Sequence, residues 1–272
     1  MRMFQWGGFA ALLAFAGAAD AAAVLKAQYL FQNSLASSVA GAPDLVNVDP
    51  MGANAFVTDT VHGETRSVFR TGGTASKSQQ GGLSFNSGGL LSPTEYSVAM
   101  TLKFNDASSN GRWRRILDTS NRGFDGGLYV NPQNDLEVYP GRGADTDFLA
   151  GDYRNIVLTV KPGATPGALS QVSAYIDGGA SLGLMTSVMD ISMSGILNLF
   201  LDDGSEWAPA SIAALSFYDG VLSAAEIAEI NGDPIPHPSA VPEPASWAMM
   251  ILGFGAVGVA SRRRQGARRS LA

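Results

Sequence analysis

The sequence has no cysteine, only two histidines in 272 residues, and 15% charged residues. Without cysteine the chain cannot form a disulfide scaffold, a thiolate zinc site, a lipid-anchored N-terminal cysteine or a cysteine nucleophile. His62 and His237 are too few for a three-histidine metal site. Residues 24–233 also lack a long amphipathic helix, apart from one short candidate near their end. Because 46% of the residues are apolar, the chain can still bury a large core, and wholesale disorder is excluded.

Positive charge is scarce outside the last eleven residues, which hold five of the 18 lysines and arginines. Without those five, Arg2, Asp20 and Glu243, the chain keeps 12 basic and 22 acidic residues, a net charge of −10. An acidic central part argues against nucleic acid or an anionic membrane surface as its partner.

The first 23 residues have the features of a secretory signal peptide. Arg2 supplies the positive start, Phe9–Ala16 is a short apolar run, and small residues follow around Ala19–Ala21, with Ala23 as another possible cleavage position. The alternative is a buried hydrophobic helix, but a lone cation, a short apolar run and small residues rarely occur together in one. The sequence therefore predicts an export signal at residues 1–23.

The C-terminal region combines four features in a fixed order. The motif Pro242-Glu243-Pro244 is followed by Trp247, then an apolar stretch over residues 248–260, and last the basic cluster Arg262, Arg263 and Arg264. Residues 245–261 would reach about 25 Å as a helix, the lower limit for a hydrocarbon core of roughly 30 Å. The arginines would stay on the cytoplasmic side, leaving the Pro-Glu-Pro motif outside.

This order resembles the bacterial PEP-CTERM sorting signal, here over residues 242–272 after a Pro-rich linker at 234–241. The resemblance implies an exosortase-type membrane protease or transpeptidase as partner, which cuts near Pro-Glu-Pro. It also implies a Gram-negative bacterium that makes exopolysaccharide, an inner-membrane-anchored precursor, and release or transfer to the cell surface or extracellular matrix. The alternative is an ordinary single-pass anchor.

Residues 24–233 are expected to form an all-β domain. Short alternating or apolar runs recur between Gly, Asn, Asp and Pro residues, which is typical of strands joined by turns. In residues 96–104, alternate apolar side chains would face the core, while residues 155–160 are apolar throughout, as in a central strand. Asp177-Gly178 and Asp219-Gly220 are hairpin-type turns. Many short strands in one body predict a two-sheet sandwich.

Three segments in this order resemble a laminin-G-like, concanavalin A-like jelly roll. They are Tyr-Arg-Asn-Ile-Val-Leu-Thr-Val at 153–160, Ala-Tyr-Ile-Asp-Gly at 174–178 and Tyr-Asp-Gly-Val-Leu-Ser-Ala-Ala-Glu-Ile at 218–227. In the last segment, Ser223 can cap a short helix, with Glu226 completing a capping box. The resemblance covers residues 24–233, loosely between 36 and 80.

Related sandwiches include polysaccharide hydrolases, which need two carboxylates across the scissile bond. Those enzymes usually carry Glu-x-Asp-x-Glu on one strand. Here Asp135 and Glu137 are followed by Tyr139 where the third acid would stand. No Gly-x-Ser-x-Gly accompanies His62, so a serine triad is not favoured. We therefore expect the chain not to be an enzyme.

Calcium is the metal that the resemblance implies, held by aspartates and loop carbonyls. Asp202, Asp203 and Glu206 place three carboxylates directly after an expected strand, and Asp118 at another strand end could join them. Ca²⁺ takes six to eight oxygen ligands. The alternative is a solvated turn with no ion.

A glycan site is predicted from aromatic and arginine side chains, since sugars stack on exposed rings. Trp207 lies beside the acidic loop, and Trp113 lies among Arg112, Arg114 and Arg115, which could bind uronate or sulfate groups. The alternative is a hairpin loop in which Trp113 folds onto the sandwich and the arginines pair with aspartates.

The resulting hypothesis is an exported protein with a non-catalytic exopolysaccharide-binding jelly roll. Two rivals remain open, a structural matrix component without a specific ligand and a divergent glycan hydrolase.

Overall fold

The computed structural model describes residues 22–235. The predicted signal peptide up to residue 21, and the sorting region from residue 236, lie outside the described residues. Among residues 22–235, no helix has the length and apolar character needed to cross a membrane.

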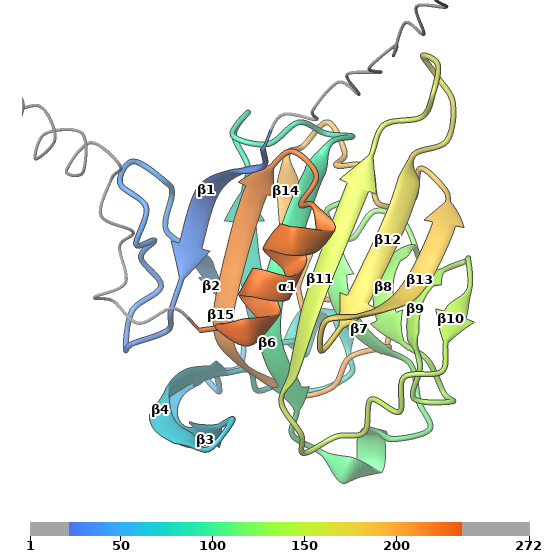
Figure 1. Ribbon diagram of the computed structural model, residues 1–272. Coiled ribbons are helices and arrows are strands. Elements are labelled where there is room, and N and C mark those ends of the chain that lie inside the picture. The colour runs from blue at the N-terminus through green and yellow to red at the C-terminus, as the bar shows by residue number, and fades with distance from the viewer. Residues whose placement is uncertain (1–21, 236–272) are drawn as a thin grey trace, which may run out of the picture. The chain divides into compact units, whose positions relative to one another are not determined.

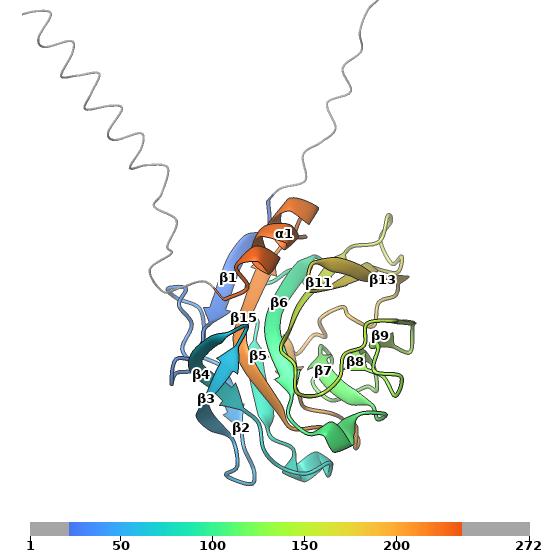
Figure 2. The ribbon, with the colours of Figure 1, turned by 60° about the horizontal axis from the view of Figure 1, so that its bottom comes forward.

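The described body consists of two antiparallel β-sheets packed face to face, which confirms the expected two-sheet sandwich. Figure 2 shows β15, β6 and β11 in one layer and β5, β7, β8 and β9 in the other. The eight-stranded sheet runs in the order β13 (Gly179–Met185), β12 (Gln171–Ile176), β11 (Arg154–Lys161), β6 (Tyr96–Phe104), β15 (Ala210–Asp219), β4 (Glu64–Arg70) and β3 (Ala55–Val61), with β1 (Val24–Tyr29) paired to β15. The seven-stranded sheet runs in the order β10 (Gly143–Ala144), β9 (Leu136–Tyr139), β8 (Gly127–Val130), β7 (Arg114–Asp118), β14 (Ile196–Leu199), β5 (Gly82–Asn86) and β2 (Val46–Val48). Short 3-10 turns lie at Lys77–Gln79 and Ala107–Ser109.

The core lies between the sheets and follows the alternation of side chains along each strand. Strand β6 has the bounds expected from the sequence, and its predicted inward residues Tyr96, Val98, Met100, Leu102 and Phe104 all belong to the buried core. Stacked rings join the two layers, since the centroid of Phe85 on β5 lies 4.0 Å from that of Phe217 on β15.

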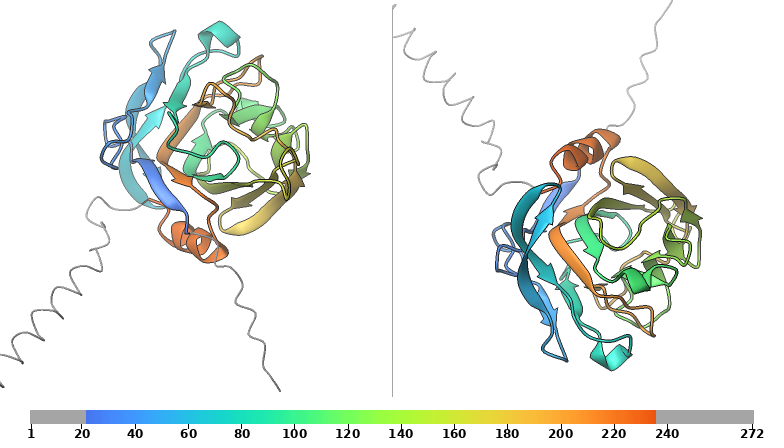
Figure 3. Two further views of the ribbon diagram at one scale, coloured as in Figure 1. Left: turned by 90° about the horizontal axis from the view of Figure 1, so that it is seen from above. Right: turned by 90° about the horizontal axis from the view of Figure 1, so that it is seen from below.

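The outer face of the eight-stranded sheet is covered by α1 (Ala224–Gly232), as Figure 1 shows. Ile227 of the helix packs with Leu222 against Ala99 of β6 and Val157 of β11. The capping box predicted at Ser223 is present. Both views of Figure 3 place the helix outside the sandwich.

The outer face of the seven-stranded sheet carries polar and aromatic side chains. Residues directly opposite each other in an antiparallel pair point to the same face. Arg115 of β7 lies opposite Tyr129 of β8, which lies opposite Glu137 of β9. The inward positions of β7 and β8 instead hold core residues such as Leu117 and Leu128. This outer face holds most of the sequence-predicted site residues.

Candidate functional site

Arg115 is the centre of a carboxylate cluster on this outer face. Its side chain is fully buried, and its Nε lies 3.1 Å from Asp202 Oδ1. Three further carboxylates surround the guanidinium, with nitrogen-to-oxygen distances of 3.2 Å to Asp203, 3.5 Å to Asp118 and 3.7 Å to Asp125. Buried charges require such compensation. Arg115 therefore supplies positive charge from inside the protein at the point where the sequence suggested a metal ion.

Tyr129 connects the arginine to the acids. The Arg115 guanidinium carbon lies 4.7 Å from the centroid of the Tyr129 ring, and its Nε donates to the Tyr129 hydroxyl. That hydroxyl lies 3.1 Å from Asp125 Oδ1 and 3.3 Å from Asp202 Oδ1. Burial raises the pKa of Tyr129, so the phenol keeps its proton and donates it to one of the two carboxylates.

The Asp202 side chain holds the loop that follows β14 in a turn by accepting hydrogen bonds from the loop's own backbone. Its Oδ2 accepts hydrogen bonds from the backbone N–H of Gly204 at 2.7 Å and of Glu206 at 2.9 Å. Its Oδ1 faces Arg115 and Tyr129. Because Asp202 is completely buried, the interpretation of this loop as a solvated turn is wrong for that residue. All its acceptor positions are used by protein donors.

Asp118 has a similar structural role at the end of β7. Its Oδ1 accepts from the N–H and hydroxyl of Ser120, and its Oδ2 accepts from Arg122 N at 2.7 Å and Asn198 Nδ2 at 2.9 Å. These bonds shape the turn after β7. Asp118 and Asp203 are not part of the group of carboxylates that lie close enough together to share an ion.

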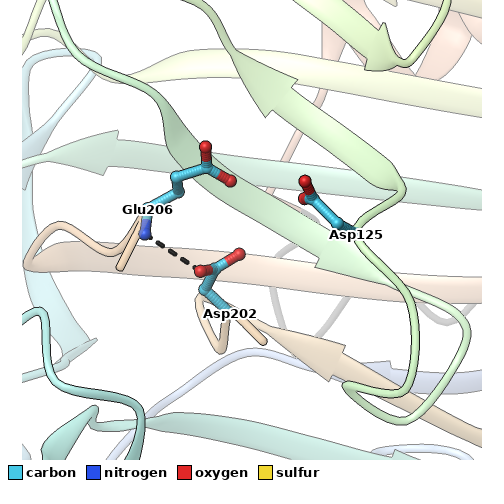
Figure 4. Close-up of side chains that lie close together, drawn as sticks. All are labelled: Asp125, Asp202 and Glu206. Carbon is cyan, nitrogen blue, oxygen red and sulfur yellow. Dashed lines mark hydrogen bonds between the residues drawn. The ribbon is translucent and has the colours of Figure 1, made fainter. Parts of the chain in front are cut away.

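That group is Asp125, Asp202 and Glu206, whose nearest oxygens all lie within 4.8 Å of one another and could hold a metal ion. Figure 4 shows the three carboxylates close together. Among the described residues, the Glu206 carboxylate has no hydrogen-bond or ion-pair partner. Burial, then the neighbouring Asp125 and Asp202, raises the pKa of Glu206 to about 7. Burial also raises the pKa of Asp203.

Asp125 was missed by the sequence reasoning. It stands in a Gly-rich loop before β8, 77 positions from Asp202 in the numbering, with no acidic neighbour to mark it. Only the pairing of β7 with both β8 and β14 brings the two loops together. Asp125 could have been found only if the strand order β8, β7, β14 had been known beforehand.

The three arginines predicted as a ligand-binding cluster are separated by the alternation of β7. Arg112 is exposed, whereas the side chains of Arg114 and Arg115 are buried. Arg114 points inward, with its guanidinium 4.8 Å from the Phe104 ring centroid. It donates to Asn110 Oδ1, Asn134 Oδ1 and the Phe148 carbonyl. Burial lowers its pKa to about 10. The prediction that Arg114 and Arg115 present their guanidiniums to a glycan is therefore corrected.

Trp113 lies on the same outer face, beyond Tyr129 from the carboxylates. Its ring is partly exposed and meets Tyr129 edge to face at 5.6 Å and Tyr139 at 5.3 Å. Trp207 is also partly exposed, and its Nε1 donates to the Gly81 carbonyl at 2.9 Å. The backbone N–H of Arg115 donates to the Glu206 carbonyl, so the acidic loop runs beside β7.

A family model described as the PEP-CTERM protein-sorting motif matches residues 240–264. This stretch is a PEP-CTERM sorting signal. The PEP-CTERM motif implies export and sorting to the surface of a Gram-negative bacterium by an exosortase. The positions Pro242, Glu243, Pro244, Trp247 and Arg262–Arg264 all fall within the match. The comparison with curated proteins found no match to this chain.

The sandwich is similar to solved concanavalin A-like domains at low sequence identity. Domain 4 of AbnA, a GH43 extracellular arabinanase from Geobacillus stearothermophilus solved with arabinotriose, is 16% identical with a TM-score of 0.56. It covers 78% of this chain and is itself covered completely. The botulinum neurotoxin serotype D binding domain is 10% identical with a TM-score of 0.54, covering 77% of this chain. A structure of botulinum neurotoxin type C is 12% identical with a TM-score of 0.53 and covers 79% of this chain; cell entry of that toxin depends on interaction with two ganglioside molecules. This chain covers 52% of each neurotoxin chain, about half its length. These similarities show the fold.

Proposed function

We propose that this exported surface protein binds extracellular polysaccharide, without cleaving it, on the outer face of its seven-stranded sheet. One observation carries the proposal. Trp113 is held at a fixed angle by Tyr129 and Tyr139, keeps part of its ring exposed, and shares its face with the unpartnered Glu206 carboxylate. Sugars are bound by stacking on such rings while polar groups accept their hydroxyl hydrogens.

The charge of the site favours a neutral glycan. Arg115 and Arg122 stand against five carboxylates, those of Asp118, Asp125, Asp202, Asp203 and Glu206. An acidic polysaccharide would be repelled unless a cation accompanied it. The arabinotriose bound to AbnA domain 4, a neutral sugar on a similar fold, agrees with this class of ligand.

Calcium is a second component of the proposal. Asp125 and Glu206 keep oxygens that protein donors do not saturate, and Ca²⁺ bound there would also relieve their mutual repulsion. Asp202 would contribute only by giving up a hydrogen bond. The ion would add to the charge that Arg115 already provides.

Hydrolysis is the alternative that one observation favours. A carboxyl with a pKa of about 7 is suited to act as a general acid, and Asp125 is its one carboxylate neighbour with an exposed side chain. We prefer binding because the Glu-x-Asp-x-Glu strand of related hydrolases is missing, with Tyr139 where its third acid would stand.

Native gels cast with arabinan, xylan, β-1,3-glucan or alginate test the proposed function. We expect the full chain in nonionic detergent to be retarded by at least one neutral polysaccharide, with no reducing sugar released on prolonged incubation. Retardation by none of them would favour a structural component without a ligand, and sugar release would establish the hydrolase.

Thermal unfolding in EDTA and then in millimolar Ca²⁺ tests the metal. A ligand bound only to the native state adds about 2.7 kcal/mol at a hundredfold excess over its Kd. We expect the midpoint to rise in the unaltered protein and in the control Glu229→Gln, a change on the surface of α1, but not in Glu206→Gln. Equal midpoints with and without Ca²⁺ would remove calcium from the proposal.

A further inference from the structure

Phe124 is the only exposed phenylalanine, tyrosine or tryptophan among residues 22–235, with 51% of its surface accessible to solvent. Exposure of a large apolar ring is unfavourable, so a ring held in solvent often marks a binding surface. Phe124 lies directly before Asp125, in the loop that leads into β8. The ring is therefore adjacent in the chain to a carboxylate of the candidate site.

The Phe124 ring rests on a glycine. A Cβ built on Gly126 would lie 2.4 Å from Phe124 Cε1 and 2.8 Å from Val188 Cγ1. The ring can occupy this position because Gly126 has no side chain. One side of the ring is thus supported by protein, while half of its surface remains open to solvent.

The loop that carries Phe124 is fixed by the centre of the site. The Phe124 carbonyl accepts from Arg115 Nη2 at 3.4 Å and from Gly126 N at 2.9 Å, and the Gly126 carbonyl accepts from Arg115 Nη2 at 3.3 Å. Trp113 contacts the Tyr129 ring, on which Arg115 also packs, and the tip of Arg115 reaches the Phe124 backbone. The two aromatic residues therefore border the carboxylate group from different loops.

We propose that Phe124 is a second stacking position of the same glycan site, so that the ligand is a polymer bound over at least two sugar units. Asp125, which follows Phe124 in the chain, and Glu206, whose oxygen lies within 4.8 Å of that of Asp125, accept hydroxyl hydrogens from the bound chain. This inference rests on the proposed function. It adds that a short sugar can stack on only one of the two rings, Trp113 or Phe124, and therefore binds weakly.

Retention of the full chain, in nonionic detergent, on beads carrying arabinan, xylan, β-1,3-glucan or alginate tests the inference. On the polysaccharide that retains the unaltered protein, we expect Phe124→Ala to weaken retention roughly tenfold, the loss of about one aromatic contact. Phe124→Trp should keep it. Gly126→Ala should weaken it by displacing the ring. Leu169→Ala removes a side chain that is 52% exposed in the loop between β11 and β12, and should have no effect.

The results separate the second stacking position at Phe124 from the proposed glycan binding itself. If Trp113→Ala lowers retention while Phe124→Ala behaves like Leu169→Ala, the second stacking position is wrong and the proposed function stands. If the unaltered chain is retained by none of the four polysaccharides, both are wrong. Competition with oligosaccharides gives an independent readout, because the gain in affinity with chain length should disappear in Phe124→Ala.

Discussion

Replacing Arg115 by Met tests whether this buried cation organises the site. The substitution keeps much of the side-chain volume but removes the one cation that, among residues 22–235, forms ion pairs with all of Asp118, Asp125, Asp202 and Asp203. Asp118 and Asp202 are completely buried, so water cannot compensate them without opening the loops.

The free energy of unfolding lost in Arg115→Met is the difference between the ion-pair attraction that is removed and the cost of burying the guanidinium that is saved. At 3.1–3.7 Å, a pair of unit charges interacts by roughly 4–5 kcal/mol at an effective dielectric constant of about 20. Removing the guanidinium also removes the several kcal/mol spent on burying it. Breaking a buried pair by deleting one partner costs about 3–5 kcal/mol net. For a body of this size, that corresponds to a fall of about 10 °C in the unfolding midpoint.

The adjacent Arg114 provides the matched control. It is equally buried, but among the described residues no carboxylate forms an ion pair with it. Arg114→Met removes the donor to the Phe148 carbonyl, while Asn110 Oδ1 and Asn134 Oδ1 still accept from the N–H groups of Ala150 and Gly111. It also relieves a buried charge that has no counter-ion. We expect a cost of about 1–3 kcal/mol, without pH dependence between pH 7 and pH 4.5.

Urea titrations of residues 22–240 at pH 7 and pH 4.5 measure both variants. Arg115 lowers the pKa of Asp203 and of Glu206 against the effect of burial, so its removal should raise both. The loss in Arg115→Met should therefore be largest at pH 7 and should shrink at pH 4.5, where these two carboxyls can take up protons. Equal losses in the two variants at pH 7, or a loss in Arg115→Met that is independent of pH, would refute the reasoning.

Three further predictions follow from individual contacts. Glu206 has a pKa of about 7 in the folded protein against an ordinary 4.5, so the cost of ionising it in the folded state is absent below pH 4.5 and complete above pH 7. In EDTA, Glu206→Gln should therefore raise the thermal midpoint at pH 8 and leave it unchanged at pH 4. Ser223→Ala removes the helix cap and should cost about 1 kcal/mol in urea unfolding, whereas a change below 0.3 kcal/mol, roughly the effect of an exposed helix position, would show that the cap is dispensable. Phe85→Ala removes the ring stacked on Phe217 between the sheets and should cost about 3–5 kcal/mol, and a much smaller loss would place the core elsewhere.

The sandwich was predictable because its strands carry strong local signals. The alternation in residues 96–104 gave β6 with its bounds, and Ser223 with Glu226 gave the start of α1. Both signals depend on side chains within a few positions of one another.

The arrangement of the site was not predictable in the same way. Arg114 and Arg115 are neighbours in the sequence, but adjacent residues in a strand point to opposite faces of the sheet. Arg114 therefore points into the core against Phe104, whereas Arg115 lies among the carboxylates on the outer face. Sequence alone does not say which. Asp125 joined Asp202 through the order of strands across the sheet, a long-range property that local residue patterns do not encode.

The most direct measurement of the central claim compares the full chain, Trp113→Ala and Trp207→Ala in native gels cast with the polysaccharide that retards the unaltered protein. The account predicts that Trp113→Ala migrates as it does in a gel without polysaccharide. Trp207→Ala should stay retarded, because the Trp207 indole is held by its hydrogen bond to the Gly81 carbonyl and makes no contact with the Trp113, Tyr129 and Tyr139 rings. Equal retardation of the unaltered protein and Trp113→Ala would contradict it and place glycan binding away from this face.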